Sequence, residues 1–150
     1  MKRWAQGKFT LKHPEKYVGN KSPTYRSSWE FHFMKFCDEN PAIGAWASEA
    51  IKIPYRSPLT GKPTVYVPDF FIQYKDKKGN AKVELIEIKP STQAMKENIG
   101  RNSHNQASYV LNMAKWEAAY KYAKSKGIKF RVITEKELFH QGKRLSLIHI

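Results

Sequence analysis

The predicted fold of this chain depends on two short stretches, Tyr66-Val67-Pro68-Asp69-Phe70 and Leu85-Ile86-Glu87-Ile88-Lys89-Pro90. The segments around them, 65–72 and 83–89, are rich in β-branched, aliphatic and aromatic residues, which is typical of strands. Residues 75–80 between them carry Lys, Asp, Gly and Asn and predict a hairpin loop. Antiparallel pairing then brings Asp69 close to the Glu87 end of its partner strand, and alternation puts Glu87 and Lys89 on one face.

Helix signals flank this pair of strands. Ser27-Ser28-Trp29-Glu30 is a capping-box pattern, and it predicts a helix that begins at Ser27 and is closed by Pro41. A long helix is predicted from residue 103 to residue 126, with Gly127 as its C-terminal stop. The remaining predictions are a strand at 46–53, a turn region at 58–63, a strand at 129–133, and a short helix opened by a second capping box at 134–137. The order α-β-β-β-α-β predicts an α/β fold, with a mixed sheet flanked by helices.

Helical periodicity predicts which faces of the two longer helices are buried. In the first helix the apolar stripe comprises Trp29, Phe33, Phe36 and Cys37, with Met34 at its edge. Lys35, Asp38 and Glu39 lie opposite that stripe, whereas Glu30 falls inside the apolar arc. In the long helix the stripe comprises Tyr109, Met113, Trp116, Tyr120 and Ala123.

Composition and charge limit the possible partners. The 150 residues suit one domain, and 27 Lys and Arg against 13 Asp and Glu give a net charge of +14. Such a charge attracts polyanions and favours a nucleic-acid partner. We expect no membrane partner, because no apolar run approaches the roughly 18 residues that span a bilayer and no basic amphipathic helix has a clean apolar stripe to lie on an anionic surface. We expect no nucleotide cofactor, because no Gly-rich phosphate loop is present, and no structural zinc, because one cysteine and five histidines show no ligand spacing.

The ends of the chain differ from its middle. Residues 1–24 are polar and basic and predict a flexible arm, and residues 25–142 form the predicted domain. Residues 143–150 are a predicted tail, whose last six residues, Leu145-Ser146-Leu147-Ile148-His149-Ile150, resemble a translated sequencing-library adapter. We therefore expect those six residues to be non-native.

Asp69 and Glu87 are the candidate ligands of a divalent cation. Carboxylates that meet at one edge of a sheet suit Mg²⁺, for which Mn²⁺ is an expected substitute, and the backbone carbonyl of Ile88 can complete the protein's share. Lys89 is placed to orient a water molecule or to stabilise charge on a phosphate. Ordinary structural roles stay open, because Pro-Asp often starts a turn, Glu-x-Lys often forms a surface ion pair, and Glu30 can serve only its capping box. Tyr25, Tyr55, Tyr66 and Trp46 are candidates either for stacking on bases or for the core.

The combination of Pro68-Asp69 with Glu87-Ile88-Lys89 resembles the PD-(D/E)xK nuclease superfamily, which has a restriction-endonuclease-like core. Residues 22–142 further resemble the head-completion nucleases of large myoviruses, a family related to a transposon end-cleaving endonuclease. The segments that carry this resemblance are 25–30, 46–51, 66–70, 85–90 and 112–116.

The resemblance implies a Mg²⁺-dependent DNA endonuclease that acts on packaged phage DNA before tail attachment. It implies that Glu30, Asp69 and Glu87 hold one or two Mg²⁺ ions and that Lys89 is catalytic. Glu49, Asn112 and Lys115 recur in the family, and each is a possible contact of the site or of DNA or an ordinary structural residue. Expected partners are DNA and capsid, portal or neck proteins, and the expected location is the host cytoplasm or the virion.

Two other functions fit the same residues. One is a non-catalytic DNA-binding connector that closes the capsid portal and keeps the carboxylates as structural residues. The other is a transposon or repair endonuclease, which shares the chemistry and differs in its biological setting.

Overall fold

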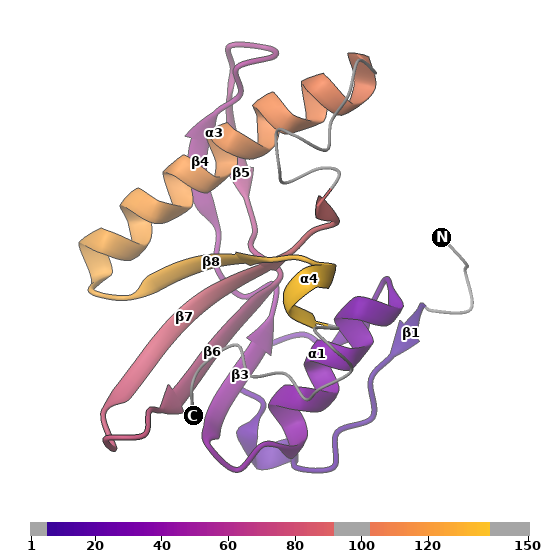
Figure 1. Ribbon diagram of the computed structural model, residues 1–150, viewed down its shortest axis with the longest axis vertical. Coiled ribbons are helices and arrows are strands. Elements are labelled where there is room, and N and C mark those ends of the chain that lie inside the picture. The colour runs from indigo at the N-terminus through magenta and orange to yellow at the C-terminus, as the bar shows by residue number, and fades with distance from the viewer. Residues whose placement is uncertain (1–5, 92–102, 139–150) are drawn as a thin grey trace.

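A four-stranded mixed sheet forms the centre of the protein (Figure 1), as described by a computed structural model for residues 6–91 and 103–138. The strand order is β3-β6-β7-β8, formed by Ile43–Ser48, Phe70–Lys75, Ala81–Ile88 and Lys129–Ile133. The first three strands pair antiparallel, and β8 pairs parallel to β7. Parallel neighbours need a crossover connection, and the long helix α3 (Ser103–Lys126) lies between β7 and β8 in the chain.

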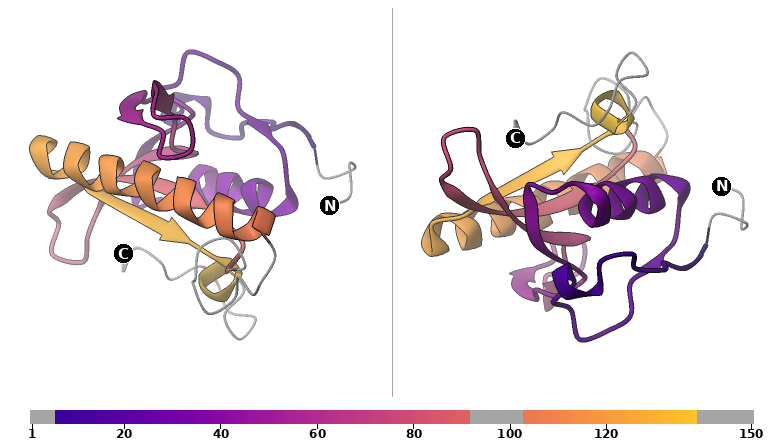
Figure 2. Two further views of the ribbon diagram at one scale, coloured as in Figure 1. Left: turned by 90° about the horizontal axis from the view of Figure 1, so that it is seen from above. Right: turned by 90° about the horizontal axis from the view of Figure 1, so that it is seen from below.

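Two helices cover the two faces of this sheet. Phe33, Met34 and Cys37 of α1 (Ser28–Glu39) pack with residues of all four strands in one core cluster. On the other face, Trp116, Ala119 and Ala123 of α3 pack against Leu85 and Phe130. Figure 2 shows the arrangement, with α3 in front of the sheet when the molecule is seen from above and α1 in front of it when it is seen from below. The predicted order α-β-β-β-α-β is confirmed, as α1-β3-β6-β7-α3-β8.

The helix boundaries follow the local sequence signals. Ser27 caps α1, since its side chain accepts a hydrogen bond from the Glu30 N–H. The helix α3 spans the predicted residues, and Gly127 follows it with a φ of 71°, a conformation that glycine adopts without strain. Thr134 caps the short helix α4 (Glu135–Leu138), since its hydroxyl accepts a hydrogen bond from the Lys136 N–H while its N–H and hydroxyl donate to Glu137 Oε2.

Two predicted strands were wrong in their extent. The segment 46–53 is split, because β3 ends at Ser48 and Glu49 adopts a positive φ of 52°. A new strand, β4 (Ile53–Arg56), runs through Pro54 and pairs with β5 (Pro63–Tyr66), so the predicted turn region lies at the tip of a two-stranded ribbon. The segment 65–72 is likewise divided between β5 and β6, because residues 67–69 leave the ribbon before they reach the sheet. Prolines are tolerated here because the ribbon consists of edge strands.

The segment predicted as an arm packs on the domain over its described residues, 6–24. Phe9, Leu11 and Tyr17 pack against the core cluster that contains the buried residues of α1. The strands β1 (Gly7–Lys8) and β2 (Thr24–Tyr25) pair with each other, and the short helix η2 (Pro14–Lys16) lies between them in the chain. This packing corrects the prediction for Asp38, which was assigned to the solvent face. Asp38 is buried, because its carboxylate accepts hydrogen bonds from the backbone N–H groups of Lys12 and His13.

The buried stripe of α3 is rotated from the predicted one. The most buried positions are Asn112, Trp116, Ala119 and Ala123, whereas Tyr120 is 56% exposed and packs edge-on against Phe130. The small side chains at 119 and 123 allow close approach to the sheet, which hydrophobicity alone does not indicate. The predicted tail at 143–150 lies outside the described residues. None of the helices described is both long enough and apolar enough to cross a bilayer.

Candidate active site

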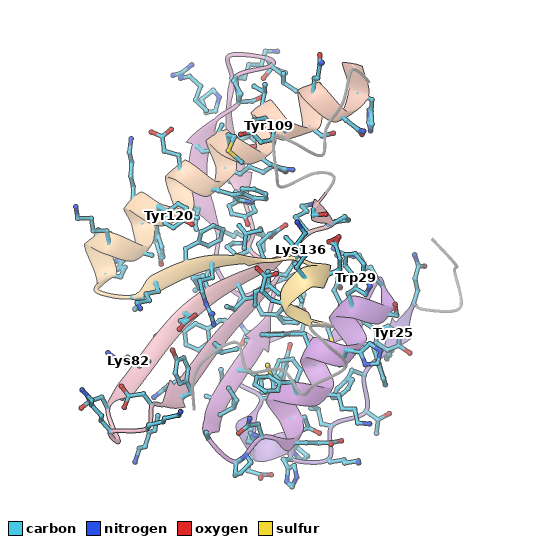
Figure 3. The ribbon with its side chains drawn as sticks, viewed as in Figure 1. Tyr25, Trp29, Lys82, Tyr109, Tyr120 and Lys136 are labelled. Carbon is cyan, nitrogen blue, oxygen red and sulfur yellow. The ribbon has the colours of Figure 1, made fainter. Side chains whose placement is uncertain are left out.

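Asp69 and Glu87 meet at one end of the β6–β7 pair. Phe70 is paired with Ile86, so Asp69, one residue earlier, faces Glu87, one residue later. Asp69 Oδ2 accepts a hydrogen bond of 2.8 Å from the Ile88 N–H, which orients the carboxylate toward the end of β7. Lys82, labelled in Figure 3, lies toward the opposite end of β7. The predicted convergence of the two carboxylates is therefore confirmed by the register.

Both oxygens of Glu87 have partners. Oε1 accepts a hydrogen bond of 2.6 Å from the Tyr66 hydroxyl, and Oε2 lies 3.5 Å from Lys89 Nζ. Glu87 is 5% exposed, whereas the Lys89 side chain is 28% exposed. The backbone of Lys89 is held by a hydrogen bond from its N–H to the Ile133 carbonyl. Lys89 therefore contacts the buried carboxylate of Glu87 and is itself partly exposed to solvent at the end of the sheet.

Sequence reasoning did not assign Tyr66 to the site. Tyr66 ends β5, three residues before Asp69, and its ring packs edge-on against Phe130 with centroids 6.2 Å apart. Tyr66 and Trp46 are two of the candidates either for stacking on bases or for the core. Tyr66 is 5% exposed and Trp46 is fully buried, so both belong to the core. No short motif marks a tyrosine at this spacing, since its hydroxyl reaches Glu87 only through the packing of the ribbon on α3.

The carboxyl groups influence each other electrostatically. Burial raises the pKa of Asp69 well above its usual range, and the negative charges of Glu87 and Glu30 raise it further. Burial also raises the pKa of Glu87, an effect opposed by the Tyr66 hydrogen bond and the Lys89 charge. Desolvation and like charges at short range both disfavour ionised carboxylates. A divalent cation would relieve that repulsion.

Glu30 and Glu49 lie beside this pair. Glu30 Oε1 accepts a hydrogen bond of 3.0 Å from the Arg26 N–H, so Glu30 serves the N-terminus of α1. The pKa of Glu30 is raised mainly by burial and also by the charges of Glu49 and Glu87. Glu49 pairs with Arg26 at 2.5 Å, and its N–H donates to the Asp69 carbonyl. The structure therefore brings both residues next to the site. The Glu30 carboxylate contacts the backbone of Arg26, and the Glu49 carboxylate contacts its guanidinium group.

Lys115 and Asn112 approach the site from α3. Lys115 Nζ lies 5.9 Å from the centroid of the Tyr66 ring, a geometry that suits a cation–π contact. Burial and the nearby Lys89 charge lower the pKa of Lys115, whereas the charges of Glu87 and Asp69 oppose that shift. Asn112 is 4% exposed and belongs to the buried face of α3.

The oxygen donors of the site fit a hard divalent cation. Within residues 6–91 and 103–138, no three Asp, Glu, His or Cys side chains lie close enough to form a ligand cluster as they stand. The carboxylates of Asp69 and Glu87 and the carbonyl of Ile88 offer oxygen only, which is the donor type that Mg²⁺ prefers. Their mutual repulsion and their hydrogen bonds from Tyr66 and the Ile88 N–H are consistent with such a role.

A Pro-Asp facing a Glu-x-Lys across antiparallel strands, in a mixed sheet between two helices, defines a nuclease of the restriction-endonuclease-like fold. Residues 40–135 match the family described as "TnsA-like endonuclease N terminal". The chain is also similar to the "Head completion nuclease" of Enterobacteria phage T4, with 38% identity over 142 residues that cover 86% of this chain and 90% of that protein. The chain belongs to the TnsA-like endonuclease family, which confirms the predicted fold and the prediction of an endodeoxyribonuclease.

Proposed function

We propose that this protein is a Mg²⁺-dependent DNA endonuclease that processes packaged phage DNA during head completion, before tail attachment. The observation that carries the proposal is the convergence of Asp69 and Glu87 at the end of β7, with Lys89 beside them. Family membership supports the hydrolysis of nucleic acid, and the net charge of +14 supports a polyanionic substrate.

Each residue of the site has a defined part in this proposal. Asp69, Glu87 and the Ile88 carbonyl would hold the cation, with Glu30 as a further ligand or an electrostatic neighbour. When bound, a divalent cation lowers the pKa of coordinated water and withdraws charge from a phosphate, which hydrolysis requires. Tyr66 fixes one oxygen of Glu87, and Lys89 presents an ammonium group to solvent at the same point. That ammonium group is placed to hold the attacking water or a phosphate oxygen.

The biological setting is proposed from the phage relative. Because that protein is named a head completion nuclease, we propose that this chain acts in the host cytoplasm on filled heads and stays with the virion. Its proposed partners besides DNA are capsid, portal or neck proteins. Mass spectrometry of purified particles tests this, since a protein that completes heads should be found in virions and a transposon or repair endonuclease should not.

The experiment for the chemistry compares the wild type with Asp69→Ala on branched and single-stranded-tailed DNA in Mg²⁺ or Mn²⁺. Cleavage is expected from the wild type and is expected to fall by several orders of magnitude in the variant. The matched control is Asp76→Ala, since Asp76 lies at the other end of β6, in the β6–β7 turn, where it accepts hydrogen bonds from backbone N–H groups. Cleavage that survives Asp69→Ala contradicts the assignment of the site.

One observation favours a second function, a non-catalytic DNA-binding connector. Glu87 contacts Tyr66 and Lys89, and Asp69 accepts a hydrogen bond from the Ile88 N–H, so each carboxylate has a protein partner without a cation. A connector binds DNA with the same salt dependence but cuts no substrate with any divalent ion. Absence of cleavage by the wild type would support that function.

A further inference from the structure

The β4–β5 ribbon extends from the sheet beside α3 (Figure 1), and the hydrogen bond from Tyr66 to Glu87 places one end of it at the candidate active site. At its base Ile53 pairs with Tyr66, whose hydroxyl binds Glu87, and at its tip Arg56 pairs with Pro63. Ile53 and Tyr66 are buried in the core cluster on the α3 side. Pro54 and Val65 pair on the opposite face and are exposed, Val65 by 51%. The ribbon therefore has one packed face and one free face.

The ribbon and α3 carry a strong excess of positive charge. Residues 50–68 contain three cationic residues, Lys52, Arg56 and Lys62, and no Asp or Glu. All three are exposed, and Arg56 donates to the Gly61 carbonyl, which holds its guanidinium at the tip. In α3 four lysines stand against one acid, Glu117, which is itself paired with Lys121 at 3.0 Å. Tyr109 and Tyr120, labelled in Figure 3, lie along this helix.

Other surfaces near the site are less suited to a polyanion. The helix α1 contains one lysine and three acids. In the segment that covers it, Lys12 pairs with Glu39, and Lys16 donates to the carbonyls of Asp38 and Asn40. The β6–β7 turn is basic, with Lys77 and Lys78, but β7 is eight residues long, which separates that turn from Glu87 by roughly 20 Å.

We propose that the free face of the β4–β5 ribbon, together with α3, binds duplex DNA next to the bond that is cleaved. A two-stranded ribbon fits the major groove of B-form DNA, and exposed cations along it neutralise phosphates. The inference rests on the proposed function, because it takes the Asp69–Glu87 end as the position of the reacting phosphate.

The length of the ribbon sets the reach of this contact. Lys62 lies four residues from Tyr66, which corresponds to about 13 Å along a strand. With roughly 3.4 Å between base pairs, this reach covers about four base pairs of duplex beside the site. Lys52 lies at the base of the ribbon, so the two lysines mark its two ends.

The experiment measures duplex binding in EDTA, where no metal-dependent cleavage occurs, over a series of salt concentrations. The double variant Lys52→Ala/Lys62→Ala is compared with the wild type and with Lys77→Ala/Lys78→Ala, which removes two exposed lysines from the other turn. Each lost phosphate contact lowers the slope of log K against log salt by about 0.9. The expected loss is therefore about 1.8 for the ribbon variant and none for the control, with thermal melting to confirm that both fold.

The outcomes separate this inference from the function on which it rests. A slope that is unchanged in the ribbon variant, or that falls only in the control, overturns the DNA-binding face even if the wild type cuts DNA. A wild type that does not bind duplex DNA at all also overturns it. If the ribbon variant loses binding while the wild type cuts nothing with Mg²⁺ or Mn²⁺, the face is retained and the nuclease function is rejected.

Discussion

The hydrogen bond from Tyr66 to Glu87 makes a sharp prediction about the proposed metal site. Tyr66→Phe removes the hydroxyl that donates to Glu87 Oε1 at 2.6 Å and keeps the ring that packs on Phe130. The carboxylate of Glu87 then loses its donor while it remains buried. With Oε1 released, the side chain is free to rotate away from Asp69, so the effect should appear in ion binding as well as in stability.

The expected magnitudes follow from the burial and charge of the pair. A hydrogen bond to a charged group contributes about 1.5–3 kcal/mol, and we expect the variant to lose stability within that range. Residues that orient a metal ligand typically change affinity by about 10–100-fold, and we expect Mn²⁺ binding to weaken by that factor. The Tyr66 bond also holds down the pKa of Glu87, so removing it should move the pH dependence of Mn²⁺ binding upward.

The assay is Mn²⁺ titration of the DNA-free protein, followed by electron paramagnetic resonance, together with urea unfolding. Tyr74→Phe is a matched control, because Tyr74 makes a comparable bond to Glu84 in the same sheet, where Arg131 also pairs with Glu84. Both variants should lose stability, but only Tyr66→Phe should lose Mn²⁺ affinity. Equal Mn²⁺ affinity in Tyr66→Phe and the wild type would refute the positioning role of Tyr66. A wild type that binds no Mn²⁺ would instead refute the proposed metal site.

Three further predictions concern stability. In EDTA, Asp69→Asn should melt at a higher temperature than the wild type, because the raised pKa of Asp69 means that folding disfavours its ionised carboxylate, a cost that the neutral amide avoids. This difference in melting temperature between the variant and the wild type should grow as pH rises above about 4 and vanish in stronger acid. A difference that grows toward acid contradicts the prediction. Ser27→Ala should cost about 1 kcal/mol in urea unfolding, since it removes the cap of α1, and no loss would mean that the cap contributes nothing. Deleting residues 1–24 should lower the melting temperature, because buried Asp38 loses two donors; an unchanged melting temperature would restore the prediction of a free arm.

Local sequence signals predicted the parts of this fold that short-range chemistry controls. The caps at Ser27 and Thr134 and the stop at Gly127 form within one helical turn, so neighbouring residues determine them. The register that brings Asp69 to Glu87 follows from one hairpin and the alternation of faces. Local signals did not predict that the strands expected at 46–53 and 65–72 are divided, at Glu49 and at residues 67–69. That division depends on where the β4–β5 ribbon separates from the sheet.

From sequence alone, the kind of fold, the antiparallel pairing of the two motif strands and the family resemblance were determined, since periodicity and residue type carry that information. Only the tertiary structure decided that Tyr66 binds Glu87, that Lys115 lies over its ring, and that residues 6–24 bury Asp38. Each of these contacts joins elements far apart in the chain, and their geometry depends on how helices and strands pack rather than on any local preference.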